Sequence, residues 1–221
     1  MKAAADAQRE LAGDKAARIV DAMRTSVGER GTAGSTFEEV ARAAGVSRGL
    51  LHYYFGTKER LLIEVVRRDC DVRLGLLDAQ LAEARSADDV VAGLVASLDD
   101  LVRNDPGFVT LIFELFTLAR RNEEIAVEFA ELLRRQRERL AELLRAKAAA
   151  GVLRLRAEPE AVVDVIFSLG DGVAMRMLAE PDRDFAETVA AGVLCVRALL
   201  PSAVPGGKGA LGARLSTLDL P

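Results

Sequence analysis

TFEEVARAAGVSRGLLHYYFGTKERLL, residues 36–62, predicts two short helices joined by a tight turn and followed directly by a third. The first helix can begin at either of two capping boxes, one formed by Ser35 with Glu38 and the other by Thr36 with Glu39. Two helices joined in this way are the unit with which many proteins place a helix in the DNA major groove. The stretch therefore predicts a helix-turn-helix.

The turn between the first two helices is predicted at Gly45, because a residue without a Cβ enters the left-handed conformation at little cost. Ser47 is expected to cap the second helix, and Thr57 the third. The second helix is short, so Leu51 and Phe55 should face inward while its other residues face a partner. We expect this second helix to be the recognition helix.

This segment resembles the helix-turn-helix of the TetR family of transcriptional regulators. The chain departs from the family pattern at His52, where such families usually carry tyrosine, and at Glu38, where many carry a basic or neutral residue. Histidine keeps a hydrogen-bond donor for phosphate, whereas Glu38 either accepts from a cytosine amino group or faces solvent. The similarity covers residues 18–62 and rests on Arg18, Ile19, Ala22, Gly31, Thr36, Val40, Ala41, Ala44, Gly45, Val46, Ser47, Gly49, Leu51, Tyr53, Tyr54, Phe55, Lys58, Glu59, Leu61 and Leu62.

The resemblance and the side-chain chemistry together imply which residues touch double-stranded DNA. Hydroxyl and ammonium groups suit phosphates, a guanidinium can bind guanine with two hydrogen bonds, and leucine can contact the thymine methyl group. The expected phosphate contacts are Thr36, Ser47, His52, Tyr54 and Lys58; the expected base-facing residues are Arg48, Gly49 and Leu50; Phe37 and Tyr53 complete the expected DNA-binding set.

Length and composition indicate how the rest of the chain is organised. The 221 residues allow one domain of about 50 residues and another of about 150. Alanine, leucine, arginine and glutamate dominate and no run of alternating β-branched residues occurs, so we predict an all-α protein. We expect the helix-turn-helix domain at 10–60, a ligand-binding and dimerisation domain at 61–200 and a flexible tail at 201–221.

Several classes of protein and site are disfavoured. The chain has no apolar run long enough for a membrane span and no signal-peptide pattern, so we expect a cytoplasmic protein with no membrane partner. With one histidine and no CxxC spacing, we predict no metal site and no cofactor. Cys70 and Cys195 are expected to be buried free thiols, with a disulfide or a shared metal as the alternative.

The net charge of −4 argues against a nucleic-acid partner until the chain is divided. Residues 1–60 contain ten Lys/Arg and eight Asp/Glu, a net of +2, while residues 61–221 contain twenty and twenty-six, a net of −6. The positive balance thus lies with the helix-turn-helix, and the acidic remainder should repel DNA and so orient docking.

Beyond the DNA-binding segment the apolar pattern predicts long helices. The first runs from Lys58 to about residue 84, so it would begin in the DNA-binding domain, end in the second domain and act as a lever between them. The others are expected at 88–103, with a break at Pro106, and then at 107–120, 123–150, 158–180 and 184–200.

The segment PGFVTLIFELFTLAR, residues 106–120, is the most apolar, and a helix that is apolar all round is expected to be buried. Glu114 interrupts it. This carboxylate either pairs with an arginine such as Arg176, faces solvent, or is a polar group of an apolar ligand cavity. Under the last hypothesis a small, mostly apolar effector contacts Phe108, Leu111, Ile112, Phe113, Glu114, Phe116, Thr117 and Met175.

Residues 113–181 resemble, more loosely, the C-terminal domain of the TetR subgroup typified by the choline-responsive repressor. The chain has no tryptophan and its two tyrosines, Tyr53 and Tyr54, lie in the DNA-binding segment, so we do not expect a cage for choline itself. The resemblance implies that the last two helices form a four-helix interface in a homodimer, through Val162, Val165, Ile166, Leu169, Val173, Met177, Val189, Val193, Val196 and Leu200.

Asp171, flanked by Gly170 and Gly172, invites a catalytic role, but a buried hydrogen-bond partner beside a closely packed helix is the simpler interpretation. No nucleophile or dinucleotide-binding motif occurs, so we do not predict an enzyme. We predict a dimeric repressor that a small effector releases from a palindromic operator. The alternative is a regulator of the same family that answers to a partner protein or acts as an activator.

Overall fold

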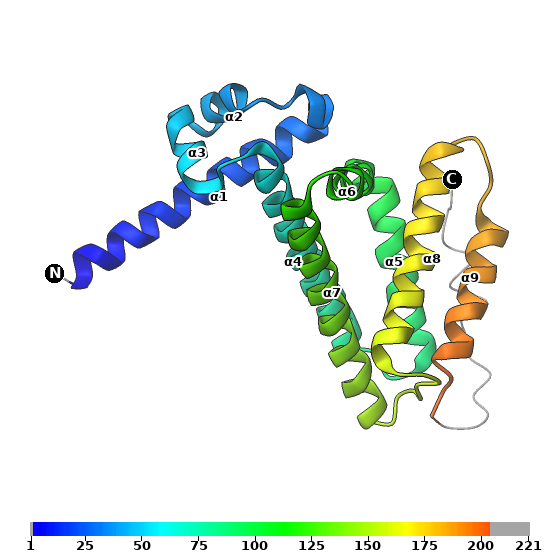
Figure 1. The fold of residues 1–221 in the computed structure, drawn as a ribbon. Helices are drawn as coiled ribbons and strands as arrows, with labels where there is room; N and C mark the ends of the chain where they lie inside the picture. Colours follow the sequence, from blue (N-terminus) through cyan, green and yellow to red (C-terminus); the bar gives the residue numbers. More distant parts are fainter. Residues whose placement is uncertain (1, 204–221) are drawn as a thin grey trace. The chain divides into compact units, whose positions relative to one another are not determined.

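The computed structural model describes residues 2–203, which form α-helices joined by short connections (Figure 1). The predicted all-α class is confirmed, and the one β-type pairing among these residues is an isolated bridge between Leu153 and Ser202. The helices are α1 (Lys2–Gly34), α2 (Phe37–Ala44), α3 (Arg48–Phe55), α4 (Lys58–Ala82), α5 (Ala87–Asn104), α6 (Pro106–Ala119), α7 (Glu123–Ala149), α8 (Pro159–Ala179) and α9 (Ala186–Leu199).

Local signals account for several helix ends. Ser86 and Asp89 form a capping box that starts α5. Pro106 was expected in a break after α5, but it is the first residue of α6. Pro159 likewise begins α8. Proline suits this position because the first N–H of a helix has no partner within the helix and the fixed φ of the ring is already helical.

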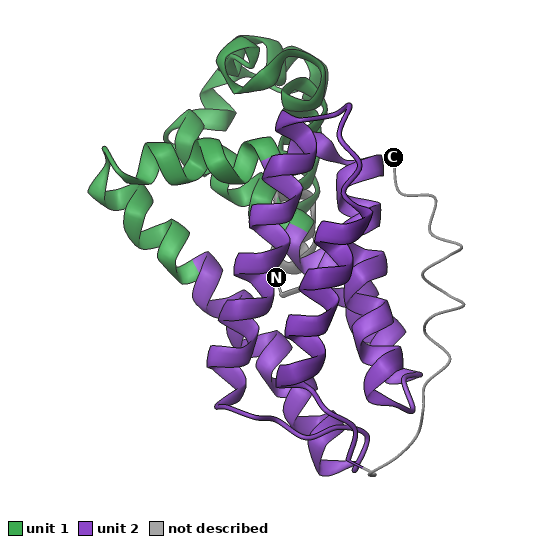
Figure 2. Ribbon diagram, turned by 90° about the vertical axis from the view of Figure 1, so that its right-hand side faces the viewer, with its two compact units in different colours: residues 1–69, 110–131 green, residues 70–109, 132–221 purple. Residues whose placement is uncertain are grey.

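The chain divides into two compact units (Figure 2). Unit 1 comprises the residues up to Asp69 together with Thr110–Glu131, and unit 2 comprises Cys70–Val109 together with the residues from Leu132 onward. Residues 110–131 therefore group with the N-terminal helices, although they lie far from them in sequence. The expected domain boundary after residue 60 stays a prediction.

Unit 2 is built on an aliphatic core between α4, α5, α7 and α8. Its described C-terminal end is fastened by backbone hydrogen bonds, since Arg154 N donates to Pro201 O at 2.8 Å. The expected tail therefore does not begin at residue 201, and residues 204–221 lie outside the described part of the chain. The buried core residues are Leu77, Leu81, Ala84, Ala87, Val90, Leu140, Ala141, Leu144, Leu153, Val162, Val163, Ile166 and Leu200.

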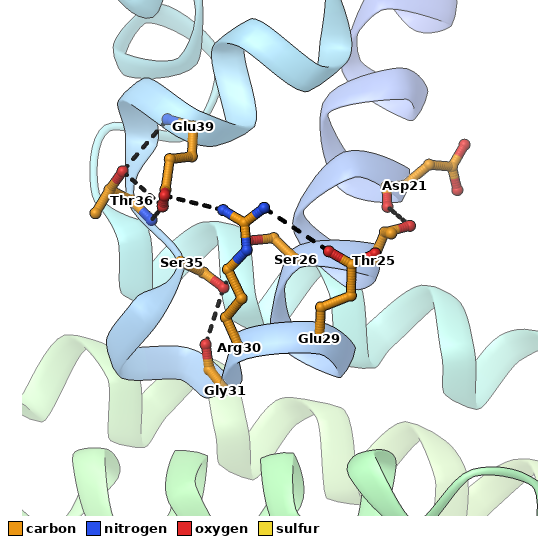
Figure 3. A network of polar contacts seen from close by, with 9 residues as sticks. All are labelled: Asp21, Thr25, Ser26, Glu29, Arg30, Gly31, Ser35, Thr36 and Glu39. Carbon is orange, nitrogen blue, oxygen red and sulfur yellow. Dashed lines mark hydrogen bonds and ion pairs between the residues drawn. The ribbon is translucent and has the colours of Figure 1, made fainter.

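Unit 1 contains a kink that positions the start of α2. Gly31 has φ 71° and ψ 174°, so it interrupts the helical conformation of α1. The hydroxyl of Ser35 donates to the carbonyl oxygen of Gly31 at 2.9 Å, and the hydroxyl of Ser26 donates to Ser35 Oγ at 2.9 Å (Figure 3). Ser26 and Ser35 are both buried, so these bonds hold the kink from inside the unit.

The backbone of Gly31 occupies a region of φ and ψ that is essentially restricted to glycine. A Cβ at this position meets nothing within 4 Å, so the cost of Gly31→Ala is backbone strain and not a clash. We predict that it lowers the free energy of unfolding by about 1–3 kcal/mol. Gly28→Ala is the control, because Gly28 is helical and its Cβ would meet Arg24 Nη1 at 3.8 Å. This change should raise stability by about 0.5–1 kcal/mol. Denaturant titration of the full chain measures both, and equal effects would contradict the assignment of strain.

Candidate nucleic-acid interface

Of the two possible capping boxes at the start of α2, the structure forms the one between Thr36 and Glu39 (Figure 3). Glu39 N donates to Thr36 Oγ1 at 3.3 Å, and Thr36 N donates to Glu39 Oε2 at 3.2 Å. Arg30 Nη1 on α1 donates to Glu39 Oε1 at 2.9 Å. The hydrogen bonds from Thr36, followed by the charge of Arg30, hold the pKa of Glu39 below its ordinary value.

The capping box also occupies the hydroxyl of Thr36, one of the expected phosphate contacts. Thr36 Oγ1 donates its own hydrogen to Glu39 Oε2 at 3.1 Å while accepting from Glu39 N. A phosphate can receive that hydrogen only by displacing the carboxylate. In the protein alone, Thr36 therefore serves the helix start.

The turn before the recognition helix follows the prediction at Gly45 but not at Ser47. Gly45 is left-handed, with φ 65°, and ends α2. Ser47 occupies the N-cap position of α3, but its side chain forms no capping hydrogen bond. The turn is closed by the backbone instead, since Leu50 N donates to Ser47 O at 3.0 Å. The Ser47 hydroxyl is exposed and keeps its donor for another group.

Most of the expected base-facing surface of α3 is open. Arg48, Gly49, His52 and Tyr53 are exposed, and the Tyr53 side chain reaches 81% exposure. Among the described residues Arg48 has no ion pair or hydrogen bond for its guanidinium. Leu50 and Tyr54 are half-buried, and Leu51 is fully buried as expected.

Phe37 and His52 differ from their expected roles. Phe37 is buried, and its ring contacts the His52 ring edge-on with 4.9 Å between centroids. Its apolar ring is better satisfied inside unit 1, so Phe37 supports the exposed surface of α3 instead of forming it. His52 Nδ1 lies 3.1 Å from the carbonyl oxygen of Gly56. One ring nitrogen of His52 is therefore already engaged.

Lys58 lies in the first turn of α4, which Thr57 caps by accepting from Arg60 N at 3.3 Å. The Lys58 ammonium donates to the carbonyl oxygen of Thr32, which follows the kink at Gly31. An ammonium has three donors, so two remain for a phosphate. The contact between Lys58 and Thr32 joins residues that are 26 positions apart in the sequence. Apart from Gly31, no feature of the local sequence predicted this contact.

The expected ligand residues are distributed differently from the prediction. Leu111 is buried, and Ile112, Phe113 and Glu114 are half-buried, but Phe116 is 52% exposed and Thr117 is exposed. The inference that α6 must be buried all round was therefore wrong for the chain alone. Phe108 is buried and covered by the guanidinium of Arg73 at 4.8 Å, so its ring face is already in contact.

Glu114 is the unusual polar group of α6. Its Oε2 atom is buried and has no hydrogen-bond partner among the described residues, so the possible pairing with Arg176 does not form. A buried carboxylate oxygen without a donor is costly, because it has lost its water and gained nothing. This favours the hypothesis in which another molecule supplies the donor.

The prediction that the apolar residues of α8 and α9 all lie in the dimer interface was partly wrong. Val189 and Val193 pack on Val91 of α5, with Val173 and Val196 partly buried against them, and Met177 is also buried. Val162, Ile166 and Leu200 belong to the core of unit 2. The large apolar side chains that stay exposed on α8 and α9 are Val165, Met175 and Leu194, the last of which the sequence analysis missed.

Asp171 lies on the exposed side of α8 and is not the buried partner that was expected. The desolvation that it still experiences raises the pKa of its carboxyl. A Cβ on Gly170 or Gly172 would meet nothing within 4 Å, so no helix of the chain packs closely on these glycines. Cys70 is buried and Cys195 is exposed, and neither forms a disulfide among the described residues, so the expected burial of Cys195 is corrected.

Two protein families match this chain. Residues 19–65 match bacterial regulatory proteins of the tetR family, and residues 86–200 match the C-terminal part of the BetI-type transcriptional repressor. The HTH-type transcriptional regulator BetI of Rhizobium meliloti is 30% identical over 158 residues, which are 72% of this chain and 75% of that protein. BetI of Agrobacterium fabrum is 45% identical over 49 residues, 22% of this chain and 24% of that protein.

Solved structures share the fold. The transcriptional regulator FadR of Bacillus subtilis, in complex with stearoyl-CoA, has a TM-score of 0.63 at 20% identity and covers 83% of this chain and 97% of its own. FadR of Bacillus halodurans has a TM-score of 0.64 at 22% identity and covers 82% and 94%. Within residues 2–203, no helix combines the length and apolar character that a membrane span requires.

Lys58→Ala tests the electrostatic part of the interface. Because the remaining donors of Lys58 suit a phosphate, we expect weaker binding to any duplex and a plot of log affinity against log salt that is flatter by about one unit per subunit. Lys147→Ala is the matched control, because this ammonium is also held by carbonyl oxygens, those of Ala82 and Ala84 in unit 2. Titrations at three salt concentrations measure the slope. An equal change in both variants would mean that overall charge, and not a contact at Lys58, sets the slope.

Proposed function

The chain belongs to the tetR family of bacterial regulatory proteins, which are DNA-binding transcriptional regulators and not enzymes. From this premise we propose that it is a homodimeric repressor that acts in the cytoplasm. A small effector releases this repressor from a palindromic operator. The observation that carries the proposal is the exposed surface of α3, with the free guanidinium of Arg48. Arg48 binds guanine, Gly49 and Leu50 approach neighbouring bases, and Ser47, Tyr54 and Lys58 contact phosphates.

A homodimer is proposed because one side of α8 and α9 is unsuited to water. Both helices pack on α5, so the sides turned away from α5 form one outer surface. That surface carries Val165, Met175 and Leu194, and the exposed small residues around Leu194 include Ala190, Ala191, Ala198 and Cys195. The open space over Gly172, which shares this side of α8 with Val165, lets the backbone of a second helix come close. A two-fold dimer presents two recognition helices to successive major grooves about 34 to 36 Å apart.

Leu194→Asp tests the dimer. A charge in the middle of the outer surface should yield monomers and weaken operator binding, because a single helix-turn-helix retains half of the DNA contacts. Val127→Asp is the control, since both side chains are 65% exposed but Val127 lies on α7. Val173 is a poorer target, because it packs partly in the core of the protomer. Sedimentation measures the assembly, and a parent chain that is monomeric at micromolar concentration would refute the proposal.

Control by an effector is proposed from the composition of unit 1, which contains both the recognition helix and residues 110–131. Two ion pairs join α4 to α7 within this unit: Arg60 with Glu124, and Arg67 with Glu128 at 3.1 Å. A ligand that displaces the α6 residues Leu111 to Thr117 would therefore act within the unit that holds the DNA contacts. A coupling of about 1–3 kcal/mol is typical of such control.

The proposed effector is mostly apolar and carries one hydrogen-bond donor. The half-buried Ile112 and Phe113 supply apolar contacts, and Glu114 Oε2 receives the donor. The FadR structure with stearoyl-CoA is an example in the same fold of a ligand with a long apolar chain. Phe108 and Met175 are not retained, because Phe108 is covered by Arg73 and Met175 lies on the proposed dimer surface.

Glu114→Gln separates the ligand role from a structural role. The change removes a buried charge that has no partner, so the unliganded protein should be as stable as the parent or more stable. Its DNA affinity without effector should be unchanged, whereas release by an apolar amine or alcohol should weaken about tenfold or more. Denaturation and DNA titration with a panel of such compounds measure these effects. If no compound releases the parent, the regulator without small-molecule control is favoured.

A further inference from the structure

The hydrogen bond of His52 determines which of its ring nitrogens carries the hydrogen. Nδ1 lies 3.1 Å from the carbonyl oxygen of Gly56, and a carbonyl oxygen only accepts. The hydrogen of this bond therefore belongs to Nδ1. A neutral imidazole has one N–H and one bare nitrogen, so Nε2 is an acceptor in the neutral ring. The expectation that His52 offers a donor to phosphate holds only for the protonated ring.

Two contacts hold the imidazole ring in this orientation, and a backbone hydrogen bond helps to fix Gly56, which makes one of them. Gly56 N donates to the backbone oxygen of His52 at 3.0 Å while Gly56 O accepts from Nδ1, so the two residues are linked twice. Gly56 has φ 71° and ψ −65°, a left-handed φ that turns its carbonyl out of the helical direction. The edge-on ring of Phe37 packs against the imidazole. Nε2 is on the opposite side of the ring from Gly56 O and has no partner among the described residues.

We propose that His52 reads a base pair by accepting, at Nε2, a hydrogen bond from the exocyclic amino group of adenine or cytosine. The inference rests on the proposed function, because it requires α3 in the major groove. In that groove the N6 amino group of adenine and the N4 amino group of cytosine are the donors that bases present. Phosphate oxygens are acceptors and cannot bind a bare Nε2. His52 is therefore a specificity-determining residue and not a phosphate contact at neutral pH.

Protonation reverses this preference. A protonated imidazole has an N–H on both ring nitrogens, so in that form His52 would offer Nε2–H to phosphate or to guanine. His52 is the single histidine of the chain, while carboxylate, guanidinium and ammonium groups ordinarily keep their charge between pH 6 and 8. The charged residues on the elements around it are Glu38, Glu39 and Arg42 on α2, Arg48 on α3, and Lys58, Glu59 and Arg60 in the first turn of α4.

The test begins with duplexes that the full-length parent selects at pH 8 from a random library. Affinities of the parent, His52→Gln and His52→Lys are then measured at pH 8 and pH 6 on the selected duplex and on duplexes substituted at each half-site position. The parent at pH 8 should prefer adenine or cytosine at one position by about tenfold. Replacing that base by an analogue without the amino group, purine or 2-pyrimidinone, should abolish the preference.

The two variants separate acceptor from donor. Glutamine keeps an acceptor oxygen and does not titrate, so His52→Gln should retain the preference at both pH values. His52→Lys, which has donors alone, should lack the preference at both pH values. Circular dichroism checks that each variant is folded. An identical preference in all three proteins would overturn the inference. A parent that selects no duplex would overturn the proposed function as well.

Discussion

The left-handed φ of Gly31 is the constraint on which the candidate DNA-binding surface of unit 1 depends. It ends the long run of α1 and turns the chain so that Ser35 enters the interior, where Ser26 and the Gly31 carbonyl bind it. Thr36 can then begin α2, and the Thr32 carbonyl is presented to Lys58. One backbone conformation thus sets both the start of the helix-turn-helix and the position of a cation at its edge.

The polar groups of this surface fall into two kinds. The Thr36 hydroxyl, the Lys58 ammonium and Nδ1 of His52 are each held by a hydrogen bond within the protein. Ser47 and Arg48 have no such restraint. Held groups lose little freedom when a ligand arrives, whereas a free arginine loses its rotamer entropy but can adapt to the base that it meets. Under the proposed function, orientation on the duplex and adjustment to its sequence would therefore fall to different residues.

Sequence rules that act over a few residues predicted most of the helices. Features that depend on contacts between distant segments could not be predicted in this way. Gly45, Thr57 and the apolar spacing identified the helices, because capping and periodicity act within a few residues. Periodicity also found the apolar stripe of α9, but it could not tell that α5 covers Val189 and Val193. The contact of Lys58 with Thr32 and the isolation of Glu114 likewise depend on which segments meet in space. The helices and their caps were thus predictable from the sequence, but the hydrogen bonds of the candidate site were not.

The unpartnered carboxylate oxygen of Glu114 has a consequence for how long the protein survives in a cell. A molecule that binds the folded chain alone lowers the population of unfolded chains, on which proteases act. The proposed effector would then protect the regulator from degradation as well as remove it from its operator. Regulator would accumulate in the released form, and the operator would be reoccupied quickly once the compound was consumed.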